Sequence, residues 1–178
     1  MKSQKLPKVI WFTGLSGAGK TTLAKKLSDK LKKKNKKFFL IDGDSFRKKN
    51  KNQKFNKQNI ILNNNLIIDY IKKIYKKYDY ILVSVISPLL KTRIKAKNTF
   101  KDSYIEIHVK CSTKVLKNRD TKGLYNLAKL NKLKNLIGIN SKISYEKSNY
   151  KILVVNTGIL SINESIKKIL EYTNKHNV

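Results

Sequence analysis

The sequence predicts an α/β fold, a three-layer sandwich in which a mostly parallel five-stranded sheet lies between two layers of helices. Three observations predict this fold. Short apolar runs alternate along the chain with segments whose apolar residues recur at helical spacing. The run 80–86 is apolar almost throughout, which is typical of a central parallel strand buried on both faces. A glycine-rich loop joins the first apolar run to the first helical segment.

Local sequence signals place the elements in chain order. The first helix carries leucines along one face. Ser112 is a candidate N-cap of a later helix, and Ser161 with Glu164 fits a capping box at the start of the last one. The expected strands are 8–13, 38–41, 80–86, 104–109 and 151–155, and the expected helices are 20–34, 58–77, 89–98, 112–118 and 161–175.

Two polar segments lack a clear strand pattern. Residues 45–57 are lysine-rich, and we expect an excursion over the ligand site. Residues 119–138 are basic and have Gly123 and Gly138 near their ends, so they form either a mobile lid or a solvated pair of helices. The length of 178 residues and the hydrophobic fraction of 40% predict one domain, 1–178, with a real core.

Residues 14–21 match the phosphate-binding pattern G-x-x-x-x-G-K-[ST] at every fixed position, between a strand and a helix. Glycines let the backbone wrap around phosphate groups with its N–H groups directed inward, and the helix N-terminus adds positive potential. Lys20 would reach the β- and γ-phosphates of ATP, and the Thr21 hydroxyl would hold Mg²⁺. The predicted ATP-binding residues in this stretch are Gly14, Leu15, Ser16, Gly17, Ala18, Gly19, Lys20, Thr21 and Thr22.

Two acidic residues, Asp42 and Asp44, follow the expected strand 38–41. Side chains at the carboxyl end of a parallel strand face the crevice in which α/β sheets bind ligands. An Asp-Gly pair is also an ordinary turn signal. Beside a phosphate-binding loop, we interpret both carboxylates as parts of a ligand site.

The composition sets limits on partners and location. The formal net charge is +30, yet only Arg47, Arg93 and Arg119 are arginines, while lysine and asparagine are abundant. Arginine is the usual reader of base edges, so we interpret the charge as a compositional bias and expect no nucleic-acid partner. The single cysteine, Cys111, fits a reducing compartment. The apolar run 9–12 is too short for a signal peptide or a membrane span, so we expect a cytoplasmic protein without a membrane partner.

Several motifs, taken in order, resemble the adenylylsulfate kinase family. The stretch 9–22 resembles the family's first strand, loop and helix. Further matches are Ile41-Asp42-Gly43-Asp44 with Arg47, Ile86-Ser87-Pro88, Arg119-Asp120-Thr121-Lys122-Gly123-Leu124-Tyr125, Gly138-Ile139 and Tyr145-Glu146. A phosphate-binding loop alone identifies only a superfamily, whereas these later motifs, at family-like spacing from about residue 8 to residue 157, are much more specific.

The resemblance implies a P-loop kinase-like fold with a mobile lid, ATP and Mg²⁺ as cofactors, a small nucleotide as acceptor, and a homodimer. Members of the family transfer the γ-phosphoryl group of ATP to the ribose 3′-hydroxyl of adenylyl sulfate. By resemblance, Asp44 lies beside the acceptor hydroxyl as a base or metal-ordering group, and Arg47 holds the acceptor's phosphate. Arg119 and Lys122 belong to the lid, with Arg119 at the ATP site and Lys122 reaching the nucleotides.

Ser87 matches a position that is sometimes assigned as a phosphoserine intermediate, so it joins Lys20 and Asp44 as a catalytic candidate. Direct in-line transfer needs no such step, and we therefore expect a conformational or hydrogen-bonding role. The predicted acceptor-binding residues are Asp42, Asp44, Arg47, Phe55, Asn63, Ile86, Ser87, Lys122 and Leu136.

The departures from the family pattern lie mostly on the acceptor side. Leu136 stands where the family has a phenylalanine that stacks on the acceptor adenine, and loss of such a ring weakens base binding by about 1–3 kcal/mol. Other charged or aromatic family positions are occupied here by Asn59, Ile60, Leu62, Asn65, Leu89 and Leu90. Either the acceptor has changed, or lysines replace the missing arginines for the same acceptor.

Three other functions compete with adenylyl sulfate phosphorylation. The first is the same 3′-kinase chemistry on cytidine diphosphoramidate, in capsule phosphoramidate biosynthesis, because a smaller base tolerates Leu136 and a neutral amide needs fewer arginines. The second is a basic nucleic-acid-binding ATPase, which only the net charge favours. The third is a non-catalytic relative. This alternative is weakened because the chain retains the residues that catalysis needs, namely Lys20, Thr21, Asp44 and Arg47.

Overall fold

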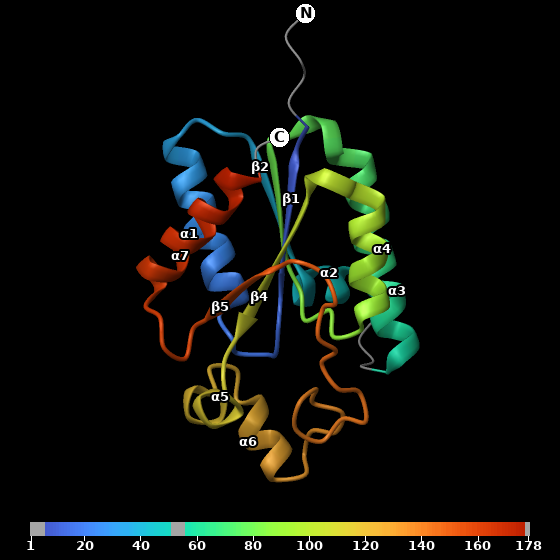
Figure 1. Cartoon of the computed structure of the whole chain (residues 1–178). Helices are drawn as coiled ribbons and strands as arrows, with labels where there is room; N and C mark the ends of the chain where they lie inside the picture. The colour runs from blue at the N-terminus through green and yellow to red at the C-terminus, as the bar shows by residue number, and fades with distance from the viewer. Residues whose placement is uncertain (1–5, 51–55, 177–178) are drawn as a thin grey trace, which may run out of the picture.

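The computed structural model describes residues 6–50 and 56–176, and it confirms the three-layer α/β fold (Figure 1). The five strands pair in parallel throughout, in the order β2-β3-β1-β4-β5. Their bounds lie within two residues of those expected: β1 Lys8–Thr13, β2 Phe38–Asp42, β3 Tyr80–Ser84, β4 Tyr104–Lys110 and β5 Leu153–Asn156.

The central strand β1 is buried along its whole length because its alternate side chains enter two different cores. Ile10 and Phe12 pack into the core on the side of α1 (Lys20–Lys33) and α7 (Ile162–Lys175). Val9 and Trp11 enter the core on the side of α3 (Lys57–Ile74) and α4 (Leu90–Phe100). Both faces of the sheet are therefore covered, as its apolar strands predict.

The segment 45–57 is more regular at its start than the sequence suggested. A short helix, α2 (Gly43–Lys49), follows β2 directly, because the Asp42 carboxylate caps it and accepts a hydrogen bond from the Ser45 N–H at 3.0 Å. Gly43 lies so close to β3 that a Cβ there would be 2.8 Å from Val85 Cγ2. The capping box at Ser161 and the N-cap at Ser112 are confirmed.

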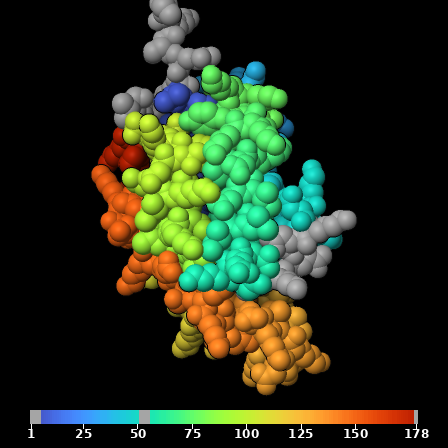
Figure 2. Space-filling model, turned by 90° about the vertical axis from the view of Figure 1, so that its right-hand side faces the viewer, coloured from blue at the N-terminus to red at the C-terminus, as the bar shows by residue number. Residues whose placement is uncertain are grey.

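The helices between β4 and β5 lie at the carboxyl end of the sheet (Figure 1). They comprise α5 (Thr113–Arg119) and α6 (Leu124–Lys129), with turns up to residue 138. Short 3₁₀ turns η1 (Tyr75–Lys77) and η2 (Lys101–Ser103) precede β3 and β4. In Figure 2, the gold residues of this part of the chain project beyond the green layer of α3 and α4. None of the helices in the described ranges is long and apolar enough to cross a membrane.

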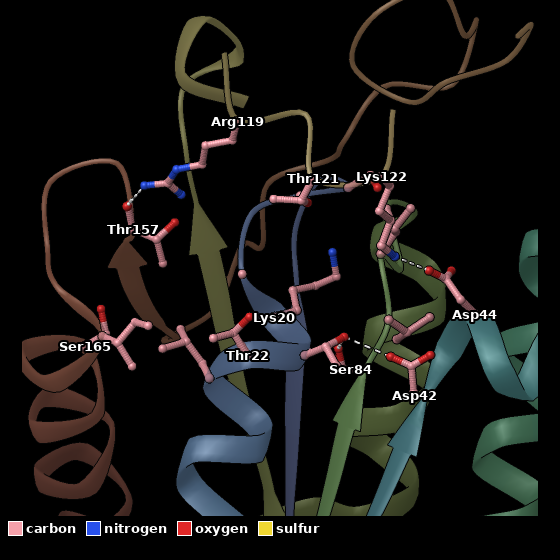
Figure 3. A pocket seen from close by; sticks show the side chains of 18 of the residues that line it. Lys20, Thr22, Asp42, Asp44, Ser84, Arg119, Thr121, Lys122, Thr157 and Ser165 are labelled. Atoms are coloured by element: carbon pink, nitrogen blue, oxygen red, sulfur yellow. Dashed lines mark hydrogen bonds and ion pairs between the residues drawn. The ribbon is translucent and has the colours of Figure 1, made fainter. Parts of the chain in front are cut away.

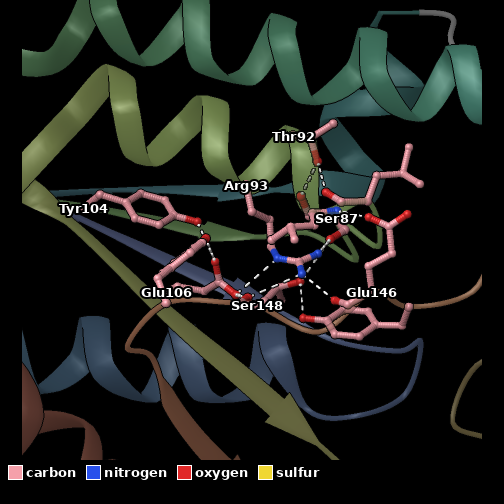
Figure 4. Close-up of polar contacts among 12 residues, drawn as sticks. Ser87, Thr92, Arg93, Tyr104, Glu106, Glu146 and Ser148 are labelled. Carbon is pink, nitrogen blue, oxygen red and sulfur yellow. Dashed lines mark hydrogen bonds and ion pairs between the residues drawn. The ribbon is translucent and has the colours of Figure 1, made fainter.

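An ion pair between α4 and β4 lies inside the protein (Figure 4). The Arg93 and Glu106 side chains are fully buried, and their Nε and Oε1 atoms are 3.1 Å apart. Arg93 also donates to the Ser87 carbonyl at 2.6 Å and to the Glu146 carbonyl, while the Glu106 carboxylate accepts hydrogen bonds from Ser148 and Tyr150. This pair therefore attaches the turn after β3 and the segment before β5 to the sheet.

Arg93→Ala should lower the free energy of unfolding by about 3–5 kcal/mol, because it leaves the buried Glu106 carboxylate without a counter-charge. The matched control is Lys72→Ala, which removes an exposed ion pair with Asp69 and should cost less than about 1 kcal/mol. Urea denaturation of the two variants measures both effects. Equal losses in the two variants would contradict the role given to the buried pair.

Candidate active site

The phosphate-binding loop connects β1 to α1 and passes close to β4. Gly14 has φ of 135°, and a Cβ at this position would lie 2.3 Å from the Val109 carbonyl oxygen, so only glycine fits. Gly19 is the N-cap of α1, with φ of 95°. Three loop residues, Ser16, Gly17 and Gly19, line a cavity of about 400 Å³ at the carboxyl end of the sheet (Figure 3). An anion in this cavity would face the N-terminus of α1.

Lys20 is the central cation of this first cavity. Its ammonium group donates a hydrogen bond to the Leu15 carbonyl at 2.7 Å, and the residue is only 8% exposed. Burial lowers the pKa of Lys20 from 10.5 to about 8. The positive charge of Lys122 adds to this shift, and the negative charges of Asp44 and Asp42 oppose it. A bound phosphate would supply the negative charge that favours the protonated form.

Oxygen atoms from three elements meet at the base of the first cavity. The Thr21 hydroxyl donates to Asp42 Oδ2 at 2.8 Å and lies 2.9 Å from Ser84 Oγ. Partial burial alone would raise the pKa of Asp42, but hydrogen bonds from the Ser45 N–H and the Thr21 hydroxyl bring it below its usual value. An ionised carboxylate beside two hydroxyl groups fits Mg²⁺, which prefers oxygen ligands and takes others from phosphates and water.

A second cavity, of about 450 Å³, lies next to the first. Arg47 and Lys48 line it from α2, and residues 133–137 also line it, with mostly aliphatic side chains. The two cavities share Ser16, Asp44, Ile86 and Lys122. An ion pair of 2.5 Å joins Lys122 Nζ to Asp44 Oδ2 at this junction (Figure 3). One carboxylate and one ammonium group thus stand between two ligand-sized spaces.

Contacts between the segment 119–138 and the rest of the site involve residues that the site prediction left out. Arg119 Nη2 donates to the Thr157 carbonyl at 2.6 Å, and the Tyr125 hydroxyl donates to the Ser16 carbonyl at 2.7 Å. Thr157 follows β5 directly, so the rule that identified Asp42 at the end of β2 also applies to it. Ser84, the last residue of β3, could have been found by the same rule.

Most of the predicted site residues line the two cavities. Leu136 and Arg47 line the second cavity, and Ile86 lines both. Gly14, Leu15 and Ala18 line neither, although they belong to the loop. The first cavity also contains Thr22, Asp42, Asp44, Arg119 and Lys122. Phe55 lies outside the described residues.

The structure does not bring Ser87 or Asn63 to either cavity. Ser87 is 1% exposed, and its hydroxyl donates to Asn64 Oδ1 at 2.6 Å in the interior, 3.3 Å from Thr92 Oγ1. Asn63 is fully buried in α3, and its side-chain amide has no hydrogen-bond partner within the described part of the chain.

Comparisons with known proteins agree with this geometry. A sequence model of the adenylylsulphate kinase family matches residues 6–156. A protein named adenylyl-sulfate kinase from Oceanobacillus iheyensis is 36% identical over 166 residues, which cover 92% of this chain and 82% of that protein. A protein of the same name from Staphylococcus haemolyticus is 34% identical over 166 residues, which again cover 92% of this chain and 82% of that protein. A solved structure of the Mycobacterium tuberculosis APS kinase CysC in complex with AMPPNP and APS has a TM-score of 0.87 at 26% identity, covering 96% of this chain and 99% of that one.

The pKa of Lys20 predicts a pH dependence of stability in the protein without ligand. Between pH 8 and 10.5 the unfolded chain holds a proton that folded Lys20 has lost, so stability rises with pH over this window. Relative to the Lys20→Met variant, the free energy of unfolding should rise by about 2 kcal/mol from about pH 7.5 to about pH 9.5. Denaturant titrations across this range measure the difference between the two proteins, and a difference that is constant with pH would contradict the lowered pKa.

Proposed function

Because the chain belongs to the adenylylsulphate kinase family and is thus an ATP-dependent nucleotide kinase, we propose that it phosphorylates the ribose 3′-hydroxyl of adenylyl sulfate. One observation carries this proposal. Two cavities of nucleotide-binding size meet at Asp44 and Lys122, next to the phosphate-binding loop. A donor and an acceptor bound in them would present the γ-phosphoryl group and the accepting hydroxyl to each other at this junction.

The first cavity would hold ATP. The loop N–H groups and Lys20 would bind the β- and γ-phosphates, while Arg119 stands at the outer edge of the cavity. Thr21, Asp42 and Ser84 would hold Mg²⁺, directly or through water. When bound, Mg²⁺ neutralises phosphate charge during the transfer.

The second cavity would hold the acceptor. Arg47 and Lys48 supply positive charge for its phosphate and sulfate groups, and the aliphatic side chains of the segment 133–137 would contact the base. Asp44 would accept the proton of the attacking hydroxyl or orient that hydroxyl, and Lys122 would balance charge on the phosphoryl group in transit. We propose that the segment 119–138 acts as the lid over both nucleotides.

Ser87 would contribute to the site without forming a phosphoserine. Its hydroxyl donates to Asn64, and its carbonyl accepts from Arg93, so the hydroxyl and the carbonyl are both used inside the protein. The adjacent residue Ile86 lines both cavities. Ser87 therefore supports the position of Ile86, which fits the expected conformational role.

A second candidate acceptor is cytidine diphosphoramidate. The described residues that line the second cavity include Leu124, Leu133, Leu136 and Ile137 but no aromatic ring, which favours a smaller base than adenine. The comparisons do not favour a nucleic-acid-binding ATPase or a non-catalytic protein. The homodimer, the cytoplasmic location and the single domain stay predictions from the sequence.

An acceptor panel tests the proposed reaction. With ATP and Mg²⁺, the protein should release ADP fastest with adenylyl sulfate, compared with cytidine diphosphoramidate, nucleoside mono- and diphosphates and no acceptor. Lys20→Ala should abolish this turnover, because the phosphates lose their buried cation. Faster ADP release with cytidine diphosphoramidate would contradict adenylyl sulfate as the acceptor and favour the second candidate. If no acceptor increased the release of ADP, both candidates would be contradicted.

The role of Asp44 predicts a loss in kcat. Asp44→Asn should lower kcat with the preferred acceptor by about 10²–10⁴-fold and should change the KM for ATP little, because the amide no longer accepts the proton. Asp69→Asn, an exposed carboxylate on α3, is the matched control and should keep full activity. Steady-state kinetics measure both variants, and an unchanged kcat in Asp44→Asn would exclude the proposed role.

A further inference from the structure

Two hydroxyl groups from distant parts of the chain bind carbonyl groups of the phosphate-binding loop. The Tyr125 hydroxyl donates to the Ser16 carbonyl at 2.7 Å, across 109 residues of sequence. The Thr157 hydroxyl donates to the Ala18 carbonyl at 2.8 Å, across 139 residues. Both contacts are made to main-chain oxygen, so they depend on the loop's conformation and not on its side chains.

Tyr125 contacts the loop from outside both cavities. It is 6% exposed, lines neither cavity, and its ring lies 3.7 Å from the point where a Cβ of Gly17 would be. Its own N–H donates to the Asp120 carboxylate at 3.0 Å, which fixes the start of α6. Burial, together with Asp120, raises the pKa of Tyr125 to about 12, so its hydroxyl remains a donor at neutral pH.

Thr157 holds the other side of the loop. Its N–H donates to the Lys110 carbonyl at 3.0 Å, which ties it to the end of β4, and its methyl group lies 3.7 Å from the position of a Gly19 Cβ. Its carbonyl accepts from Arg119 (Figure 3). The residue is thus fixed at its N–H, its carbonyl and its hydroxyl.

The two bound carbonyl groups determine where the loop's N–H groups point. In a trans peptide the C=O of one residue and the N–H of the next point in opposite directions. A Ser16 carbonyl held behind the loop therefore turns the Gly17 N–H toward the cavity, and the Ala18 carbonyl does the same for the Gly19 N–H. Gly17 and Gly19 both have positive φ, and glycine has enough conformational freedom for these peptide units to rotate if nothing holds them.

We propose that Tyr125 and Thr157 are positioning residues that fix the Ser16–Gly17 and Ala18–Gly19 peptide units with their N–H groups toward the phosphates of ATP. Because Tyr125 belongs to the segment 119–138, the conformation of the loop depends on how this segment packs against it. The inference concerns ATP binding only and does not depend on the identity of the acceptor.

Binding of the β,γ-imido analogue of ATP with Mg²⁺, measured by calorimetry, tests the proposal. Tyr125→Phe and Thr157→Val each remove one hydroxyl and should raise the Kd about three- to tenfold, the range for one lost hydrogen bond. Thr157→Ser keeps the hydroxyl and should bind like the wild type. Tyr172→Phe, on α7, removes a hydroxyl away from the loop and is the matched control. A double variant, Tyr125→Phe with Thr157→Val, that binds within about twofold of the wild type would overturn the proposal.

Amide hydrogen exchange separates positioning from general stability. With the analogue bound, the Gly17 amide should exchange faster in Tyr125→Phe and the Gly19 amide faster in Thr157→Val than in the wild type, while the amides of β1 stay protected. Exchange that rises equally throughout β1 would show a general structural role and overturn the proposal. Neither measurement uses an acceptor, so a failed acceptor panel would leave this inference standing.

Discussion

The parallel alignment of the five strands is the constraint on which the rest of the structure depends. β1 pairs in parallel with both β3 and β4, and the outer strands β2 and β5 follow the same direction. All carboxyl ends therefore meet at one edge of the sheet. Each strand supplies part of the site there: the phosphate-binding loop after β1, α2 after β2, Ile86 after β3, α5 after β4 and Thr157 after β5.

Two cations of this strongly basic protein, one buried and one exposed, are paired with an adjacent carboxylate. Only 11 residues are acidic, against 41 lysines and arginines, so the positions of the acidic groups determine where a buried cation is stabilised. Glu106 compensates Arg93 in the interior, and Asp44 compensates Lys122 at the junction of the cavities. Among the described residues no carboxylate forms an ion pair with Lys20, and its lowered pKa reflects burial that the more distant Asp44 and Asp42 only partly offset.

The sequence predicted the fold, the phosphate-binding loop and the family correctly, because these depend on local patterns. It missed α2, because the capping role of Asp42 depends on how its side chain turns back to Ser45. It listed Ser87 as a catalytic candidate while expecting a conformational or hydrogen-bonding role, and the structure shows this residue in the interior, in contact with Asn64 and Arg93. Thr157 lies at the end of a strand, where the sequence could have identified it, but its hydrogen bond to the Ala18 carbonyl, 139 residues away in sequence, has no local signal. Such contacts arise only when the chain folds.

The lining of the second cavity has a consequence for how the enzyme can diversify. Apart from Ser16 and Ile86, its lining residues come from α2 and from the segment 122–137, outside the strands, although Leu136 belongs to the core on the side of α1 and Leu124 and Leu133 pack against that core. Substitutions of its exposed residues, such as Lys48, Lys134 and Asn135, can change the charge of the cavity at little risk to folding. Under the proposed function, phosphoryl transfer thus depends on the loop, whereas the choice of acceptor depends in part on exposed side chains that can vary without disturbing the fold.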